Sequence, residues 1–453
     1  MRRLGLALAL TTIAVACGGA VGDARPQWVL HVRTDAPVPQ LGDRVLVELL
    51  GEDGQPACSG CRRLFGLATA KSWPLSFGIP DPGRGRLRVR LRLFRADHSD
   101  VGGTPIGGLP IDLVATLPPT NGDAIDVNAT LSTACAGVAA DPVAGLTCDP
   151  SSEALVQREL ARGVGDEAVT PGSFPLAQKV PCARPAPEGM SCIDGGLFTR
   201  GEVRVVTVFG GPMQSLPERL VRVGPFAIDR KEMTVGAMRA LVEAGKVLPP
   251  RTRSQDPYCT YTAGPGAFEE YPVNCVDRDR AEQTCRARGL RLPTESEWEF
   301  AAGSRDEERL YPWGSDPDAC GYAIIGRGRI GTEGAYDPSS FCRTIQNGQL
   351  LPVFGPAPVG TSLDVTAQGV LDLGGNVSEW VSDAPQAYDA RCVQGPRILS
   401  DPRCDEINGQ FAGLIRGGSW ASVGSNAAVG HREGDLATAN LFVGFRCVTP
   451  LGP

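Results

Sequence analysis

Alternation of apolar and polar residues dominates the first third of the chain. Residues 28–32 and 44–49 are rich in Val and Leu, and residues 86–93 alternate Arg with Leu or Val at a period of two. This period is typical of a strand with one buried and one wet face. Turn sequences such as Gly-Glu-Asp-Gly at 51–54 separate the runs. The pattern predicts several short strands that form an antiparallel β-sandwich over residues 27–131.

The pattern weakens after this region and then becomes helical. Residues 132–182 lack a clear period apart from a helical candidate at 152–162, and we interpret them as a linker that contains a disulfide. Two helices are predicted at 235–244 and 278–288, each ended by a glycine.

A third helix has a clear start signal. Thr294 can accept a hydrogen bond from the backbone at position 297, while Glu297 reaches back to position 294. This capping box predicts a helix that begins here, with Trp298 turned inward.

The first 17 residues have the features of an export signal. Two arginines precede an apolar stretch at residues 4–15, which is too short to span a bilayer as a helix. The sequence Ala-Val-Ala-Cys at 14–17 resembles a bacterial lipobox, although Ala14 stands where leucine is usual. Cys17 would then be acylated, and residues 18–26 would be a tether. Ordinary cleavage after an alanine, with Cys17 unmodified, is the alternative.

The residue after Cys17 bears on the final location of the protein. Gly18 differs from the aspartate that retains lipoproteins at an inner membrane. We therefore expect an exported protein of the cell envelope that is lipid-anchored to the outer membrane.

Composition narrows the class of partner. Hydrophobic residues make up 42% of the chain and charged residues 21%, which is typical of a globular protein. The net charge of -7 and the scattered basic residues argue against nucleic-acid binding, which needs a concentrated basic face.

The cysteine count agrees with export. Removing Cys17 from the fifteen cysteines leaves fourteen, which could close seven disulfides in an oxidising compartment. Spacing suggests six local pairs and leaves Cys285 and Cys447 for a long-range pair, although spacing alone does not fix the connectivity. The local pairs are Cys58 with Cys61, Cys135 with Cys148, Cys182 with Cys192, Cys259 with Cys275, Cys320 with Cys342, and Cys392 with Cys404.

Five ordered sequence blocks lie between residues 272 and 447. They are residues 272–302, which include Arg-Leu-Pro-Thr-Glu-Ser-Glu-Trp-Glu, Tyr-Pro-Trp-Gly at 311–314, Gly-Gly-Asn-Val-Ser-Glu-Trp at 374–380, Arg-Gly-Gly-Ser-Trp at 416–420 and Gly-Phe-Arg-Cys at 444–447. In this order the blocks resemble the formylglycine-generating enzyme (sulfatase-modifying factor) family. The resemblance implies that residues 183–453 form an α+β domain with a C-type-lectin-like fold. It also implies a Cys285–Cys447 disulfide.

The resemblance implies a calcium site in the third block. Ca²⁺ takes six to eight oxygen ligands. At the family's positions, Asp372 and Glu379 would supply carboxylates, and Gly375 and Val377 would supply carbonyls. The alternative is a tight turn in which Glu379 forms a salt bridge. A second family calcium site is not expected, because residues 323–325 read Ala-Ile-Ile where an asparagine would be needed.

The resemblance also implies a chemistry that the residues do not support. Enzymes of the family oxidise a sulfatase cysteine to formylglycine with O₂ and copper(I) held by two thiolates. The two thiol positions fall on Ser422 and Ala427, and no cysteine lies between Cys404 and Cys447. Copper(I) prefers soft thiolates, so copper binding is not expected. We therefore predict a non-catalytic module that binds a peptide, protein or glycan. The alternative is a formylglycine-generating oxidase, or another enzyme of the family with relocated catalytic groups.

Three other groups of residues could carry chemistry, and each also has a structural explanation. Ser419 or Ser422 could act as a nucleophile with His431 as its base, although a lone histidine beside such a loop is usually structural. Arg432 falls near a family position that lines the substrate groove, and a salt bridge is the alternative. The Cys-Ser-Gly-Cys sequence at 58–61 has redox-motif spacing but lacks a following helix, which favours a structural bridge.

Overall fold

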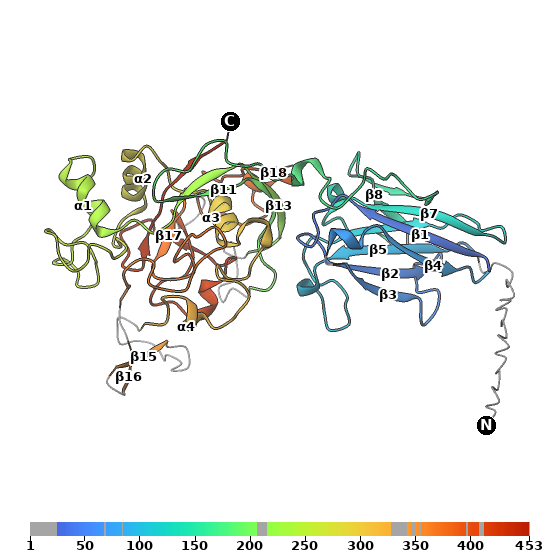
Figure 1. The fold of residues 1–453 in the computed structure, drawn as a ribbon, viewed down its shortest axis with the longest axis horizontal. Helices are drawn as coiled ribbons and strands as arrows, with labels where there is room; N and C mark the ends of the chain where they lie inside the picture. Colours follow the sequence, from blue (N-terminus) through green and yellow to red (C-terminus); the bar gives the residue numbers. More distant parts are fainter. Residues whose placement is uncertain are drawn as a thin grey trace, which may run out of the picture.

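A computed structural model describes residues 25–452 except 68, 84, 206–214, 328–341, 347–348, 353–354, 396 and 407–411. The predicted signal, Cys17 and most of the predicted tether lie outside the described residues. Among the helices that are described, none is long and apolar enough to cross a membrane. Figure 1 shows two lobes, one built from the N-terminal strands and one from the rest of the chain.

Two four-stranded sheets make up most of the N-terminal lobe (Figure 1). Their strand orders are β10-β7-β1-β4 and β3-β2-β5-β6. Buried residues of both sheets, including Leu30 and Val89, form one apolar cluster. The strands are β1 (Gln27–Thr34), β2 (Arg44–Leu50), β3 (Arg62–Gly66), β4 (Leu75–Pro80), β5 (Arg88–Phe94), β6 (Ile111–Thr116), β7 (Ala124–Leu131) and β10 (Ala161–Arg162).

The three strands predicted from alternation are confirmed as β1, β2 and β5. The expectation of purely antiparallel sheets is wrong, because β1 pairs with β7 in parallel along its whole length. Parallel neighbours need a long crossover connection, which here runs through the other sheet. The arginines of β5 lie on its half-buried face, where Arg90 pairs with Asp112 at 2.6 Å and Arg92 with Glu48 at 2.6 Å.

The expected helix at 152–162 is also wrong. The structure has strand β9 (Leu155–Gln157) there, followed by β10. β9 pairs with β8 (Leu146–Cys148), which a disulfide ties to Cys135, and β10 extends the first sheet at the edge of β7. This segment is therefore extended because it pairs with the edges of β8 and β7. Part of the predicted linker belongs to the N-terminal lobe.

The C-terminal lobe has mixed α/β structure with small sheets and few helices. Its sheets have the orders β11-β14-β22, β12-β13-β18, β20-β19-β17-β21 and β15-β16. The helices are α1 (Val235–Glu243), α2 (Arg278–Ala287), α3 (Glu295–Ala302) and α4 (Ala319–Tyr322). The strands are β11 (Met190–Ile193), β12 (Gly196–Arg200), β13 (Arg219–Val223), β14 (Phe226–Asp229), β15 (Arg343–Gln346), β16 (Gln349–Pro352), β17 (Ser378–Trp380), β18 (Ile398–Ser400), β19 (Gly413–Arg416), β20 (Arg432–Asp435), β21 (Val443–Gly444) and β22 (Val448–Pro450).

The local helix signals in this lobe are confirmed. Helices α1 and α2 each end one residue before the predicted end. Both hydrogen bonds of the capping box form at the start of α3, between Thr294 and Glu297. Trp298 is fully buried between α3 and the sheet of β19.

All seven predicted disulfides are present. The Cys285–Cys447 bond joins α2 to the segment before β22 across 162 residues, so it closes the longest loop of the set. Bridges that close long loops constrain the unfolded chain most. The Cys58–Cys61 pair is closed as well, in agreement with a structural bridge.

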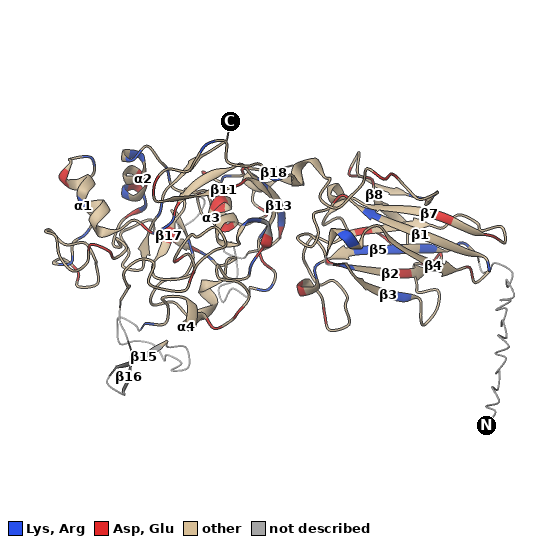
Figure 2. Ribbon diagram, viewed as in Figure 1, with Lys and Arg blue, Asp and Glu red and all other residues tan. Residues whose placement is uncertain are grey.

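In Figure 2, Lys and Arg positions and Asp and Glu positions both occur along the ribbons of the two lobes. Opposite charges meet where the lobes contact each other. Arg204 pairs with Asp97 at 2.6 Å, Arg95 pairs with Glu308, and the Nε2 atom of His98 lies 3.3 Å from Glu218.

The pKa of His98 makes this contact sensitive to pH. Burial by itself would lower that pKa, but hydrogen bonds to Asp97 and Glu218, together with their charges, raise it from 6.5 to about 9. A raised pKa means that the charged histidine stabilises the folded state fully below pH 6.5, and that this contribution disappears as the pH rises to about 9.

We expect His98→Gln to remove this pH dependence. Between pH 6 and 9.5, urea unfolding should show the wild type losing on the order of 1–3 kcal/mol more stability than the variant. His31→Gln is the control, because His31 also pairs with an aspartate, but both members of that pair lie in the N-terminal lobe. Equal pH dependence in the wild type and His98→Gln would contradict this role.

Candidate functional site

The loop after β19 holds Ser422 and Ala427, the two positions at which the family resemblance places thiols. Gly417 begins this loop with a φ of +72°, and a side-chain carbon there would clash with the carbonyl of Leu373. Only glycine fits both restrictions. Trp420 follows and is fully buried, which fixes the course of the loop over residues 421–427.

Ser422 lies partly exposed in this loop, and its hydroxyl already has partners. The backbone N–H of Ser419 donates to the Ser422 Oγ atom at 2.9 Å. The two serine hydroxyls are also 3.1 Å apart. Ser422 therefore closes the turn after Trp420.

Ala427, at the second position, is only 1% exposed. It packs in a small apolar cluster with Ala319, Ala323 and Ile325, which come from α4 and the segment after it. A hydroxyl and a buried methyl group cannot bind a soft metal ion. The residues present at these two positions do not fit copper(I).

The serine–histidine arrangement is not assembled either. The Nε2 atom of His431 is buried without a hydrogen-bond partner, and its nearest carboxylate, Glu433, is 3.9 Å away. Within the described part of the chain, neither Ser419 nor Ser422 is hydrogen-bonded to His431, since the serines bond to each other. These groups therefore offer no activated nucleophile.

Arg432 is buried, with an exposed fraction of 2%. Its Nε and Nη2 atoms donate to Glu295 at 2.7 and 2.9 Å, and its Nη1 atom donates to the carbonyl of Gln386 at 2.8 Å. Arg432 is therefore a member of a buried ion cluster, which agrees with the salt-bridge alternative.

Glu295 is the centre of this cluster. It also accepts hydrogen bonds from Arg416, at 2.8 Å, and from Arg200. Burial by itself would raise the pKa of Glu295, but the charges of Arg432, Arg200 and Arg416 outweigh it and hold that pKa far below its usual value. Glu299, one turn along α3, binds Arg416 at 2.7 Å. This cluster was not predicted from the sequence. Its available signal was the pair of glutamates four residues apart on the helix.

The loop expected to bind calcium, residues 372–379, contains two residues in the left-handed region, Asp372 and Asn376, which have φ values of +58° and +67°. Its Glu379 is fully engaged elsewhere. Arg446 donates to both Glu379 oxygens at 2.6 to 2.8 Å, and the Nε1 atom of Trp298 adds a bond of 2.9 Å. This is the salt bridge considered as the alternative for Glu379.

Three more buried carboxylates surround this salt bridge. Asp372 accepts from the Ser362 hydroxyl at 2.6 Å, and Glu232 accepts from the Asn376 amide at 2.8 Å. Asp364 accepts from the backbone of position 374 through Oδ2, whereas its buried Oδ1 atom has no partner. Burial, reinforced by neighbouring carboxylates, raises the pKa of Glu232 well above its usual range and that of Asp364 to about 8.

This arrangement fits a cation only in part. Glu379 offers no free oxygen, so it does not fit the role of a calcium ligand in this conformation. No three carboxylates of this acidic cluster have oxygens within 4.8 Å of one another in the described part of the chain. Asp372 and Glu379, however, carry two negative charges against the one positive charge of Arg446, and a cation there would also give the unpartnered oxygen of Asp364 a partner. The segment at 323–325, where a second site was not expected, instead packs against Gly375 and accepts a backbone hydrogen bond from position 376.

Comparison with known proteins relates the C-terminal lobe to one family. The profile of the sulfatase-modifying factor enzyme 1-like domain matches residues 176–451. The inactive C-alpha-formylglycine-generating enzyme 2 of Bos taurus is 32% identical over 204 residues, which cover 42% of this chain and 55% of that protein. The formylglycine-generating enzyme of Thermomonospora curvata is 28% identical over 279 residues, which cover 51% of this chain and 82% of that protein. The structure of PvdO from Pseudomonas aeruginosa is 22% identical, with a TM-score of 0.42, and the match covers 60% of this chain and 98% of that one.

Proposed function

The chain belongs to the sulfatase-modifying factor enzyme 1-like family through residues 176–451, and we propose that it is a non-catalytic member, an exported binding module. The observation that carries the proposal is the presence of Ser422 and Ala427 at the two thiolate positions. Partial alignment with a relative named as inactive supports it.

The cysteines elsewhere support the same conclusion. All fourteen cysteines of the described residues are paired in disulfides, so none provides a thiolate that could replace the missing pair. Copper(I) binding needs soft ligands such as thiolates. An oxidase that holds copper through thiolates would therefore find none among the described cysteines.

We assign the binding role to the C-terminal lobe, with a C-type-lectin-like arrangement of short strands and long loops. Its partner would be a peptide, protein or glycan, held near the loop at 419–432 where the enzymes of the family hold substrate. The N-terminal β-sandwich would hold this lobe away from the membrane. Export is consistent with the seven disulfides.

The membrane anchor is a separate part of the proposal. Cys17 should be the first residue of the mature protein and carry lipid, because a charged start, a short apolar stretch and small residues all lead to it. Intact-mass analysis of the membrane fraction should give a chain that begins at Cys17 with added acyl mass. A mature chain that begins elsewhere, with an unmodified Cys17, would contradict this assignment.

The metal content of the purified protein tests the functional proposal directly. We expect calcium without copper. Asp372 and the carbonyls of Gly375 and Val377 would hold calcium, whose charge would balance the acidic cluster. Copper at one ion per chain would overturn the non-catalytic assignment.

Removing calcium should lower the thermal midpoint. A site saturated 100- to 1,000-fold above its Kd contributes about 3–4 kcal/mol, which corresponds to roughly 5–15 °C for a lobe of this size. Asp372→Ala should have the lower midpoint with or without chelator, whereas Asp389→Ala, a change at an exposed aspartate, should behave as the wild type. An unchanged midpoint of the wild type on chelation means that the loop is only a turn.

A further inference from the structure

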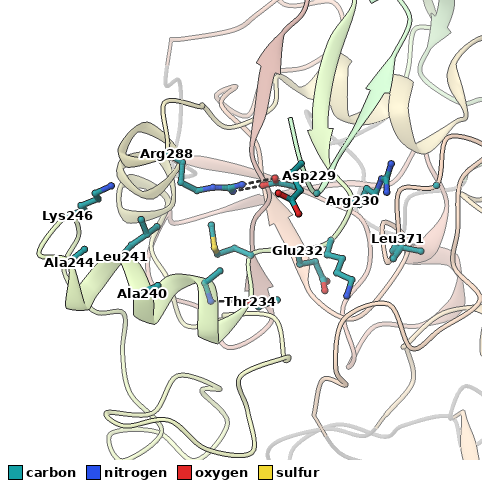
Figure 3. A pocket seen from close by; sticks show the side chains of 16 residues that line it. Asp229, Arg230, Glu232, Thr234, Ala240, Leu241, Ala244, Lys246, Arg288 and Leu371 are labelled. Atoms are coloured by element: carbon teal, nitrogen blue, oxygen red, sulfur yellow. Dashed lines mark hydrogen bonds and ion pairs between the residues drawn. The ribbon is translucent and has the colours of Figure 1, made fainter. Parts of the chain in front are cut away.

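A large cleft lies between helix α1 and the end of strand β14 (Figure 3). Its volume is about 970 Å³, within the range of pockets that bind ligands. None of the residues that line it belongs to the loop at 417–432 or to the ion cluster of Glu295. The cleft is therefore separate from the site at which the enzymes of the family act.

One wall of the cleft is apolar although it faces solvent. Ala237, Ala240 and Ala244 are exposed and lie on one face of α1, and Leu241 is half-buried beside them. The other face of the helix is buried in the core. A surface helix normally turns charged residues to solvent. Alanines at this spacing instead leave a smooth surface that another chain can approach closely.

The ends of the cleft are cationic. Two of the four lysines of the chain, Lys231 and Lys246, line it together with Arg230. All three are exposed, and in the described part of the chain none of them forms an ion pair. The Nε atom of Arg230 donates to the Ser191 hydroxyl, a neutral group, at 3.2 Å. In Figure 3, Lys246 lies beside the apolar wall, and Arg230 lies at the opposite end of the lining residues.

The acidic groups of the lining do not neutralise these cations. Asp229 forms a bidentate ion pair with Arg288, at 2.6 and 2.8 Å. Glu232 is buried, and its oxygens accept hydrogen bonds from the interior. Among the exposed charged residues of the lining that have no ion pair, three are therefore positive and only Glu188 is negative, in a protein whose net charge is -7.

We propose that this cleft binds an acidic peptide segment of a partner protein. An apolar side chain of the segment would pack on the alanine face of α1. Its carboxylates would meet Lys246 at one end and Arg230 with Lys231 at the other. The two cationic ends lie on either side of an apolar stretch, which suits an extended peptide better than a single small anion. This site goes beyond the proposed function, since it does not involve the loop at 419–432.

Selection from a random octapeptide display library tests the proposal. Peptides recovered on the full chain should be net negative and contain apolar residues. Their affinity, measured by calorimetry, should fall about tenfold or more with Lys231→Glu plus Lys246→Glu. Ala240→Phe should weaken binding by obstructing the apolar wall without a change of charge. Because all three positions are exposed, these variants should fold as the wild type does.

Two controls separate this site from others. Lys71→Glu makes the same charge change at an exposed lysine of the N-terminal lobe, and it should leave affinity unchanged. Addition of a sulfatase-type peptide with the Cys-x-Pro-x-Arg sequence should also leave the affinity unchanged, which separates this cleft from the loop at 419–432. Recovered peptides without net negative charge, or acidic peptides that bind the double lysine variant as well as the wild type, would overturn the proposal.

Discussion

Glutamine in place of Glu295 is expected to destabilise the C-terminal lobe strongly. The substitution keeps the size of the side chain and removes one negative charge that three arginines share. Arg200, Arg416 and Arg432 are each 2% exposed or less, so they cannot turn to water. Breaking a buried ion pair on one side costs about 3–5 kcal/mol, because it leaves an uncompensated charge in the interior.

Chemical unfolding of the wild type and Glu295→Gln measures this cost. A loss of about 3 kcal/mol or more is expected, a large fraction of the stability of an ordinary domain. Glu307→Gln is the matched control, since Glu307 forms a surface ion pair with Arg309 whose loss should cost at most about 1 kcal/mol. If the two variants are equally stable, the cluster does not hold the lobe together.

Signals carried by adjacent residues predicted much of this structure. The Arg–Leu alternation at 86–93 gave the position of β5. Thr294 and Glu297 gave the first turn of α3, because a capping box needs only residues that are three apart. Cysteine spacing gave the six short-range disulfides, in which both sulfurs lie close in the chain.

Features that depend on distant segments could not be predicted in the same way. The parallel pairing of β1 with β7 depends on a crossover through the other sheet. Glu295 looks like an ordinary helix residue until the fold brings arginines from three distant strands around it. Glu379 was expected to bind calcium, and its pairing with Arg446 joins residues that are 67 positions apart.

Absence of formylglycine-generating activity is the other large effect that we expect. The protein should convert no more of a peptide's cysteine than a reaction without protein does. Copper(I) needs soft ligands, and both thiolates that would hold it are missing. The hydroxyl of Ser422 is hydrogen-bonded to that of Ser419, and Ala427 packs against Ala319 of α4. No other described cysteine can take over the role of the missing thiolates, since all of them are in disulfides.

Restoring the thiols shows how far the site has diverged. If Ser422→Cys with Ala427→Cys binds copper(I), the loss of the metal site is confined to those two positions. If this variant binds none, the apolar packing of Ala427 has closed the site as well. In either case the wild type should bind no copper, and the non-catalytic assignment does not depend on which result is found.

Mass spectrometry of one peptide tests the central claim most directly. The purified protein is incubated with copper, O₂ and a peptide that contains the sulfatase-type Cys-x-Pro-x-Arg sequence, beside a reaction without protein and one with an active formylglycine-generating enzyme. We predict that the cysteine stays unconverted with this protein and is converted by the active enzyme. Formylglycine above the level of the reaction without protein would contradict the account and identify the chain as an oxidase with relocated catalytic groups.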